Sequence, residues 1–188
     1  MTTTKKFLLL DRDGVCNRDR SDYVRLPEEL EILPGIPASL GRLHRAGYRV
    51  IIITNQAGVG KGLIRPTDLE AIHQSLKSQV AMAGGHIDGI YFCPHLTEAQ
   101  CSCRKPKPGL ILAAQKEWGF NPKETWMVGD AVRDVQAARA AGCRPALVRT
   151  GHGLESIQQL PDVLAFDDLA DFTDFLLQEN TRRTKFLP

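Results

Sequence analysis

The chain has 188 residues, of which 43% are hydrophobic, and this is enough for one domain with a continuous apolar core. Its 24 basic and 22 acidic side chains give a net charge of +2, so the overall field does not favour nucleic acid or a membrane surface as a partner. Only four apolar residues stand together near the start, at 7–10, too few for a signal-peptide core or a membrane span. We therefore expect a single monomeric, cytoplasmic domain over residues 1–188.

Segments of strand type and of helix type alternate along the chain. Apolar runs of strand length occur at 6–10, 50–54, 87–92, 125–128, 145–148 and 163–166. Helix-period segments occur at 36–46, 67–84, 108–118, 132–141 and 167–177. This alternation predicts an α/β fold, a doubly wound and mostly parallel sheet flanked by helices. We expect Thr67 and Glu70 to form a capping box at a helix start, and residues 181–188 to be a frayed tail.

A first acidic pair, Asp11 and Asp13, directly follows the first predicted strand. In an extended chain residues i and i+2 project to the same side, so both carboxylates can face one site. Carboxylates held that close repel one another unless a cation lies between them, and Mg²⁺ prefers such oxygen ligands. Alone the pair is a weak signal, because loop aspartates more often cap helices or face solvent.

A second acidic pair, Asp130 and Asp134, follows a later strand. The two residues are one helical turn apart, so both can approach one cation from the start of a helix. The alternative is that they only complement the helix dipole. The carboxyl ends of parallel strands meet at one edge of a sheet, so we expect both pairs to converge there with Thr54 and Asn55.

Four possible metal ligands gather within eleven positions: Cys93, His95, Cys101 and Cys103. Three thiolates and one imidazole make a closed tetrahedral set, which suits a structural Zn²⁺ and not a hydrolytic one. The alternative is a loop of free thiols with an incidental histidine, and four soft ligands so close together argue against it. We expect the zinc to fix the loop 93–107 and so to position Arg104 and Lys105.

Four motifs, in this order, resemble those of the haloacid dehalogenase superfamily. They are Asp11-x-Asp13-Gly14, Thr54-Asn55, a downstream lysine, and Gly129-Asp130-x₃-Asp134. The likeness covers roughly residues 6–150. Finer matches resemble the heptose 1,7-bisphosphate 7-phosphatases and the related histidinol-phosphate phosphatases: Leu10-Asp-Arg-Asp-Gly14, Thr54-Asn-Gln56, Cys93-Pro-His95, Cys101-x-Cys-Arg-Lys-Pro106 and Arg149-Thr-Gly151.

This resemblance implies a magnesium-dependent phosphatase of the Rossmann-like haloacid dehalogenase fold, without a separate cap domain. Asp11 would attack phosphorus and form an aspartyl-phosphate, and Asp13 would act as general acid and then as general base. Mg²⁺ would be held by Asp11, the backbone carbonyl of Asp13 and Asp130. Asp134 would stand behind these ligands and orient metal-bound water.

The same resemblance implies phosphoryl contacts from Thr54 and Lys105, with Lys107 as the rival lysine. Specificity would come from the loops 19–24 and 56–65 and from the zinc loop. The expected substrate contacts are Arg12, Asp19, Tyr23, Asn55, Gln56 and Arg104. Arg133 is one of several further cations near this mouth, some of which will be solvated surface charge. Ala131 stands where some heptose phosphatases carry lysine, so the contacts to the distal phosphate are open.

The substrate is expected to be a small phosphorylated metabolite, and we compare four possible functions. The resemblance favours hydrolysis of the 7-phosphate of D-glycero-D-manno-heptose 1,7-bisphosphate, in lipopolysaccharide precursor synthesis. The runner-up is a histidinol-phosphate phosphatase, which the segment Arg149-Thr-Gly-His-Gly153 resembles less well. The third possibility, from another class, is a receiver-like switch, which would need a long-lived phospho-aspartate. Asp13 argues against this function, because it can activate water to hydrolyse the phospho-aspartate. A phosphatase on nucleic-acid ends is disfavoured by the near-neutral charge.

Overall fold

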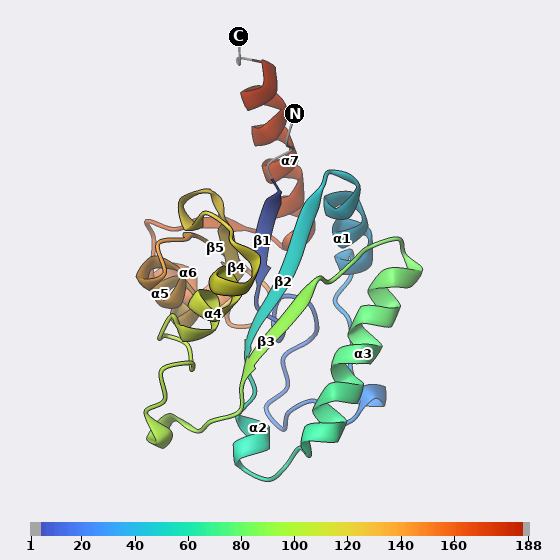
Figure 1. Cartoon of the computed structure of the whole chain (residues 1–188), viewed down its shortest axis with the longest axis vertical. Coiled ribbons are helices and arrows are strands. Elements are labelled where there is room, and N and C mark those ends of the chain that lie inside the picture. The colour runs from blue at the N-terminus through green and yellow to red at the C-terminus, as the bar shows by residue number, and fades with distance from the viewer. Residues whose placement is uncertain (1–4, 186–188) are drawn as a thin grey trace.

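The computed structural model describes residues 5–185 and has a six-stranded sheet at its centre (Figure 1). The strands are β1 (Lys6–Leu10), β2 (Tyr48–Asn55), β3 (Gly89–Cys93), β4 (Trp126–Gly129), β5 (Arg144–Val148) and β6 (Leu164–Phe166). Their order is β3-β2-β1-β4-β5-β6, and every neighbouring pair is parallel. The chain winds outward in both directions from β1 and β4, so a crevice opens at their carboxyl ends. The predicted α/β fold is confirmed.

Helices cover both faces of the sheet. They are α1 (Ile36–Arg45), α2 (Ala57–Gly60), α3 (Pro66–Met82), α4 (Gly109–Trp118), α5 (Val132–Ala140), α6 (Gly153–Gln159) and α7 (Leu169–Lys185). Helices α1, α3 and α7 share an apolar core with Leu8 and Leu10 of β1. Phe7 and Leu9 pack on the opposite face with α4 and α5 (Figure 1). Successive strand residues point to opposite faces, so a strand buried on both sides is a continuous apolar run.

Several boundaries differ from the sequence expectations. Helix α3 begins at Pro66 after an N-cap at Arg65 that makes no side-chain cap, so Thr67 lies inside the first turn and the expected capping box is wrong. Proline suits this position because the first turn needs no N–H from it. The short helices α2 and α6 were not expected. Helix α7 reaches Lys185, so residues 181–185 of the expected tail are helical, and 186–188 lie outside the described residues.

Two long connections lie at the carboxyl edge of the sheet. One runs from Asp11 to Gly35 and contains the short 3₁₀ turn Pro27–Glu29. The other links β3 to α4 and contains the 3₁₀ turn Thr97–Ala99. Within residues 5–185 these connections form loops and no separate cap domain. In this part of the chain, none of the helices combines the length and the apolar character needed to cross a membrane.

Candidate active site

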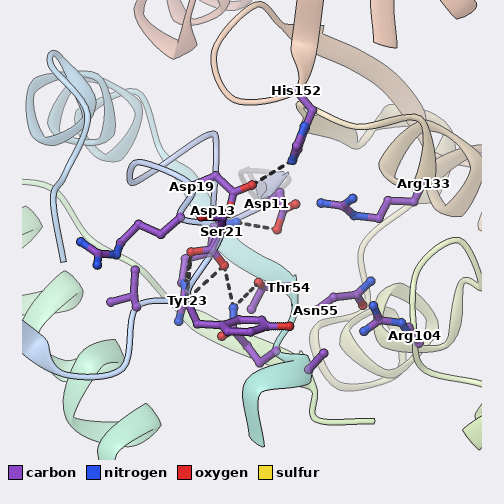
Figure 2. A pocket seen from close by; sticks show the side chains of 15 residues that line it. Asp11, Asp13, Asp19, Ser21, Tyr23, Thr54, Asn55, Arg104, Arg133 and His152 are labelled. Carbon is purple, nitrogen blue, oxygen red and sulfur yellow. Dashed lines mark hydrogen bonds and ion pairs between the residues drawn. The ribbon is translucent and has the colours of Figure 1, made fainter. Parts of the chain in front are cut away.

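Asp11 lies at the base of a cavity of about 260 Å³, one residue beyond the end of β1 (Figure 2). Its backbone N–H donates to the carbonyl of Val128 on β4 at 2.9 Å, so the sheet fixes its position. Its carboxylate oxygen Oδ1 accepts the backbone N–H of Arg12 at 2.7 Å. The residue is 3% exposed. Burial raises the pKa of Asp11 to about 8, against the opposing charge of Lys105 and with the help of Asp134 and Asp130.

Three buried carboxylates meet at this point. Asp11, Asp130 and Asp134 each offer an oxygen within 4.8 Å of the others. Burial and the neighbouring Asp134 raise the pKa of Asp130 to about 7. Its Oδ2 accepts the backbone N–H of His152 at 2.8 Å, whereas its buried Oδ1 accepts no hydrogen bond from the described residues. A buried oxygen without a donor, among repelling carboxylates, fits a hard divalent cation such as Mg²⁺.

Two glycines make room for this cluster. A Cβ at Gly14 or at Gly151 would lie 2.1 Å from Oδ2 of Asp130. Both glycines also have positive φ angles, +83° and +57°, which other residues adopt at a cost. The backbone therefore approaches the Asp130 carboxylate more closely than any other residue type would permit.

Lys105 is the lysine that reaches the carboxylates. Its Nζ lies 2.9 Å from Oδ2 of Asp11 and 2.6 Å from Oδ1 of Asp134, and it donates to the carbonyl of Ile53 at 2.8 Å. Burial alone would lower the pKa of Lys105, but Asp11 and Asp134 outweigh it and hold that pKa above its ordinary value. Asn55 fixes the backbone of Lys105 through two hydrogen bonds of 3.1 Å.

The rival lysine points elsewhere. Lys107 Nζ donates to the carbonyl of Gln100 at 2.8 Å, within the loop between β3 and α4. The two lysines are close in sequence, but only Lys105 contacts the carboxylates, whereas Lys107 contacts the loop between β3 and α4.

Asp13 does not join the other carboxylates. Its side chain accepts two hydrogen bonds from Arg12 Nη2 at 2.9 and 3.0 Å, one from Asn17 at 2.9 Å and one from Gln56 at 2.7 Å. Asp11 and Asp13 line the same cavity, as the sequence led us to expect, but the Asp13 carboxylate pairs with Arg12 and does not belong to the cluster of Asp11, Asp130 and Asp134.

The surroundings of Asp13 favour its charged form. Burial would raise the pKa of Asp13, but the charge of Arg12 and the hydrogen bonds from Arg12, Asn17 and Gln56 outweigh it and hold that pKa below its usual range. Gln56 also donates to the hydroxyl oxygen of Thr54 at 3.0 Å, so one amide positions both residues. Arg12 itself is 1% exposed and pairs with Asp13, and it also lines the cavity as a predicted substrate contact.

The remaining predicted contacts lie around the cavity (Figure 2). Asp19 and Tyr23 come from the connection between β1 and α1, and Asn55 follows Thr54 at the end of β2. Arg104 lies on the opposite side, where its Nη1 donates to the carbonyl of His95 at 3.1 Å. The cavity thus gathers residues from segments far apart in sequence.

Two residues of this cavity were not among the predicted substrate contacts. The first is His152, whose backbone N–H donates to Asp130 and whose Nε2 lies 3.0 Å from Oδ2 of Asp19. Its place between Gly151 and Gly153 was the signal, because such glycines permit a close backbone approach. Arg133 was one cation among several, and the structure places it at the cavity with its side chain extended toward Asp11 (Figure 2).

The four soft ligands also come together. The sulfur atoms of Cys93, Cys101 and Cys103 lie 3.2 to 3.6 Å apart, and His95 Nδ1 lies 3.5 Å from Cys93 and 3.3 Å from Cys103. Ligands on a tetrahedral zinc ion are spaced by about 3.5–3.8 Å. This donor set and spacing fit a structural Zn²⁺ with no position left open.

The comparisons with known proteins agree with this geometry. A family model described as haloacid dehalogenase-like hydrolase matches residues 3–142. The chain is 42% identical to the D-glycero-beta-D-manno-heptose-1,7-bisphosphate 7-phosphatase of Neisseria meningitidis serogroup B, over 94% of this chain and 97% of the relative. It is 41% identical to the protein of that name from Pseudomonas aeruginosa, over 93% and 99% of the two chains.

A solved structure is similar over nearly the whole chain. The D,D-heptose 1,7-bisphosphate phosphatase from B. bronchiseptica, in complex with magnesium and phosphate, superposes with a TM-score of 0.90 at 40% identity. The match covers 93% of this chain and 99% of that one.

Proposed function

The chain belongs to the haloacid dehalogenase-like hydrolase family, and we propose that it is a phosphatase that removes the 7-phosphate of D-glycero-D-manno-heptose 1,7-bisphosphate. The observation that carries this proposal is the buried Asp11 at the base of a cavity, 2.9 Å from Lys105 and beside a cluster of carboxylates. The curated relatives are named for the β anomer, which supports that anomer here. The sugar keeps its 1-phosphate, so the step would supply heptose 1-phosphate for lipopolysaccharide precursors.

The reaction would proceed in two displacements at Asp11. Its carboxylate attacks phosphorus, the bond from phosphorus to the ester oxygen breaks, and an aspartyl-phosphate forms. Water then attacks this phosphorus, and inorganic phosphate leaves with Asp11 restored. Lys105 and the hydroxyl of Thr54 lie beside Asp11 and would hold the phosphoryl oxygens during both steps.

Asp13 would act as general acid in the first step and as general base in the second. In the first step it protonates the leaving alkoxide, and in the second it takes a proton from the attacking water. Arg12, Asn17 and Gln56 hold it in the charged form that the second step needs. An incoming phosphate dianion beside Asp13 would raise its pKa and so favour the proton uptake that the first step needs.

Two metal ions complete the proposal. Asp11, Asp130 and the backbone carbonyl of Asp13 would hold Mg²⁺, with Asp134 behind them, and this ion supplies positive charge that offsets the repulsion between a carboxylate and a phosphate. Cys93, His95, Cys101 and Cys103 would hold a structural Zn²⁺. Reduced thiols suit the cytoplasm, which we propose as the location, and we propose a single monomeric domain.

The test compares two phosphate esters. Purified protein with Mg²⁺ would be offered heptose 1,7-bisphosphate and histidinol phosphate under the same conditions, and kcat/KM would be measured for each. We expect a large excess on the heptose bisphosphate. A large excess on histidinol phosphate would overturn the proposal in favour of the histidine-pathway alternative.

A further inference from the structure

Arg12, which stands between the two catalytic aspartates in the chain, divides its guanidinium between two partners. The Nε and Nη2 atoms donate to the carboxylate of Asp13, at 3.2 Å and 2.9 Å. The third nitrogen, Nη1, lies 3.3 Å from Nε2 of His73, a residue of α3 that comes 61 positions later in the chain. Both side chains are buried, so water does not readily replace this contact. Helix α3 therefore reaches the catalytic motif through one buried hydrogen bond.

The direction of this hydrogen bond follows from the chemistry of the two groups. A guanidinium has five N–H donors and no acceptor, so Nη1 donates and Nε2 of His73 accepts. The ring is therefore neutral and carries its proton on Nδ1. Burial and the charge of Arg12, with a smaller contribution from Lys77, lower the pKa of His73 to about 3, against the opposing charge of Asp13. The histidine thus keeps its acceptor at neutral pH.

Packing alone does not call for a histidine at this position. The neighbouring buried residues of α3, Ile72 and Leu76, are apolar members of the core. His73 packs beside Phe92 with their ring centroids 5.8 Å apart, and an apolar ring could make the same contact. An apolar side chain at position 73 would, however, remove the acceptor of Nη1 on the buried Arg12. The polar edge of the ring therefore has a role that packing does not explain.

The contact at Nη1 can set the orientation of Asp13. A guanidinium is planar and rigid, so holding one nitrogen restricts the plane in which the other two donate. Asp13 lines the catalytic cavity (Figure 2), and the place of its carboxylate decides whether a proton reaches the leaving oxygen. Asn17 and Gln56 also donate to Asp13, so loss of the contact at Nη1 would shift the carboxylate without releasing it.

We propose that His73 is a positioning residue for the general acid, which holds Arg12 so that Asp13 meets the oxygen of the leaving alcohol. This rests on the proposed function, in which Asp13 protonates that oxygen. His73 does not line the catalytic cavity, so it acts only through Arg12. Its contribution therefore belongs to proton transfer and not to binding of the sugar.

The test compares two leaving groups of different basicity. Heptose 1,7-bisphosphate releases an alkoxide, which needs a proton as it leaves, whereas p-nitrophenyl phosphate releases a stable phenolate, which needs little help. The value of kcat/KM covers the steps up to release of the alcohol, so it reports the acid and not the later attack of water. His73→Leu should lower the ratio of kcat/KM on the sugar to kcat/KM on p-nitrophenyl phosphate by about 10-fold. Both values come from one sample, so the folded fraction cancels.

Two amide variants distinguish the hydrogen bond from the shape of the side chain. His73→Gln should recover most of the wild-type ratio, because its Oε1 can accept from Arg12 in place of Nε2. His73→Asn carries the same amide on a side chain one methylene shorter, so it should behave like His73→Leu. Gln74→Leu changes an exposed neighbour on α3 and should keep the wild-type ratio. A low ratio in His73→Gln equal to that of His73→Asn would contradict the inference.

The Asp13→Asn background separates this inference from the proposed function. Its ratio should already be low, and adding His73→Leu should lower it no further, because the residue that His73 positions can no longer donate the proton. An unchanged ratio in Asp13→Asn, or a wild type inactive on the heptose bisphosphate, would overturn the proposed function. A low ratio in Asp13→Asn with an unchanged ratio in His73→Leu would overturn only the inference. The same would follow if His73→Leu lowered the ratio equally in both backgrounds.

Discussion

The carboxylate of Asp13 has donors on three sides, from Arg12, Asn17 and Gln56. These partners decide its charge, because burial alone would have favoured the protonated form. Asp11, two residues earlier in the chain, has the opposite balance, because burial outweighs the charge of Lys105 and raises its pKa. The neighbours of the two aspartates therefore shift their pKa values in opposite directions, although both residues belong to one short motif.

Asp13→Asn should lower kcat by about 10²- to 10⁴-fold, because asparagine keeps the shape and can still accept hydrogen bonds but cannot transfer the proton. Steady-state kinetics on heptose 1,7-bisphosphate would measure the loss. Asp22→Asn, on the same connection but paired with Arg20 at the surface, is the control and should keep its kcat. Stable phosphorylation of wild-type Asp11 without release of phosphate would instead support the switch reading.

His73 should make the fold sensitive to acid. It is 3% exposed, and burial together with the charge of Arg12 lowers the pKa of His73 to about 3. The unfolded chain binds this proton from about pH 6.5 downward, so the free energy of unfolding falls as the pH drops from 6.5 toward 3, by at most about 1.4 kcal/mol per pH unit.

Urea unfolding of wild type and His73→Gln at pH 7, 6 and 5 tests this. The variant should lose less stability between pH 7 and pH 5 than wild type does. His44→Gln, an exposed histidine on α1, should keep the wild-type pH dependence. Equal slopes in wild type and His73→Gln would contradict the prediction.

The loop between β3 and α4 has little regular secondary structure that could fix its conformation. Its one helical element is the 3₁₀ turn Thr97–Ala99. Both ends of the ligand set lie near the site, since Cys93 ends β3 and Arg104 and Lys105 follow Cys103. The Zn²⁺ would therefore act on catalysis through the position of two cations.

Cys101→Ser should lose zinc and lower kcat/KM by about 10- to 100-fold, because a misplaced Lys105 no longer meets the phosphoryl group. Metal content and kinetics would be measured on the same sample. Cys143→Ser, a buried thiol after α5, should keep its zinc. A zinc-free wild type with full kcat/KM would show that the ion has no such role.

For the whole molecule, the fold gathers three like charges at one edge of the sheet. This repulsion lowers the free energy of unfolding until a cation binds. The same three carboxylates that the reaction needs therefore destabilise the metal-free fold. Asp130→Asn removes one charge and keeps an oxygen for the backbone N–H of His152.

Without Mg²⁺, Asp130→Asn should melt higher than wild type, by about 2–4 °C for each kcal/mol of repulsion relieved. Mg²⁺ should raise the Tm of wild type but raise that of the variant much less, and hydrolysis should be lost. Thermal scans with Mg²⁺ and with a chelator would show this, with Asp162→Asn as the surface control. A chelator that leaves wild-type hydrolysis intact would contradict the metal site itself.

The order of strands and helices followed from sequence, because strands buried on both faces must be apolar throughout. Leu8, Leu9 and Leu10 are all fully buried, and Asp11 comes directly after them. The gathering of Cys93 and Cys103 also followed, since ligands close in sequence need little help from the fold to meet. Short elements such as α6, Gly153–Gln159, gave no comparable signal because seven residues are too few for a helical period.

Tertiary structure decided the directions of individual charged side chains. Sequence placed Asp13 at one site with Asp11, but only the folded chain shows that Arg12 and Gln56 are its hydrogen-bond donors. Sequence alone also could not show that Arg133 lies at the cavity among the carboxylates. Periodicity reports burial within a local window, whereas an ion pair depends on the distance between atoms that the folded chain alone brings together.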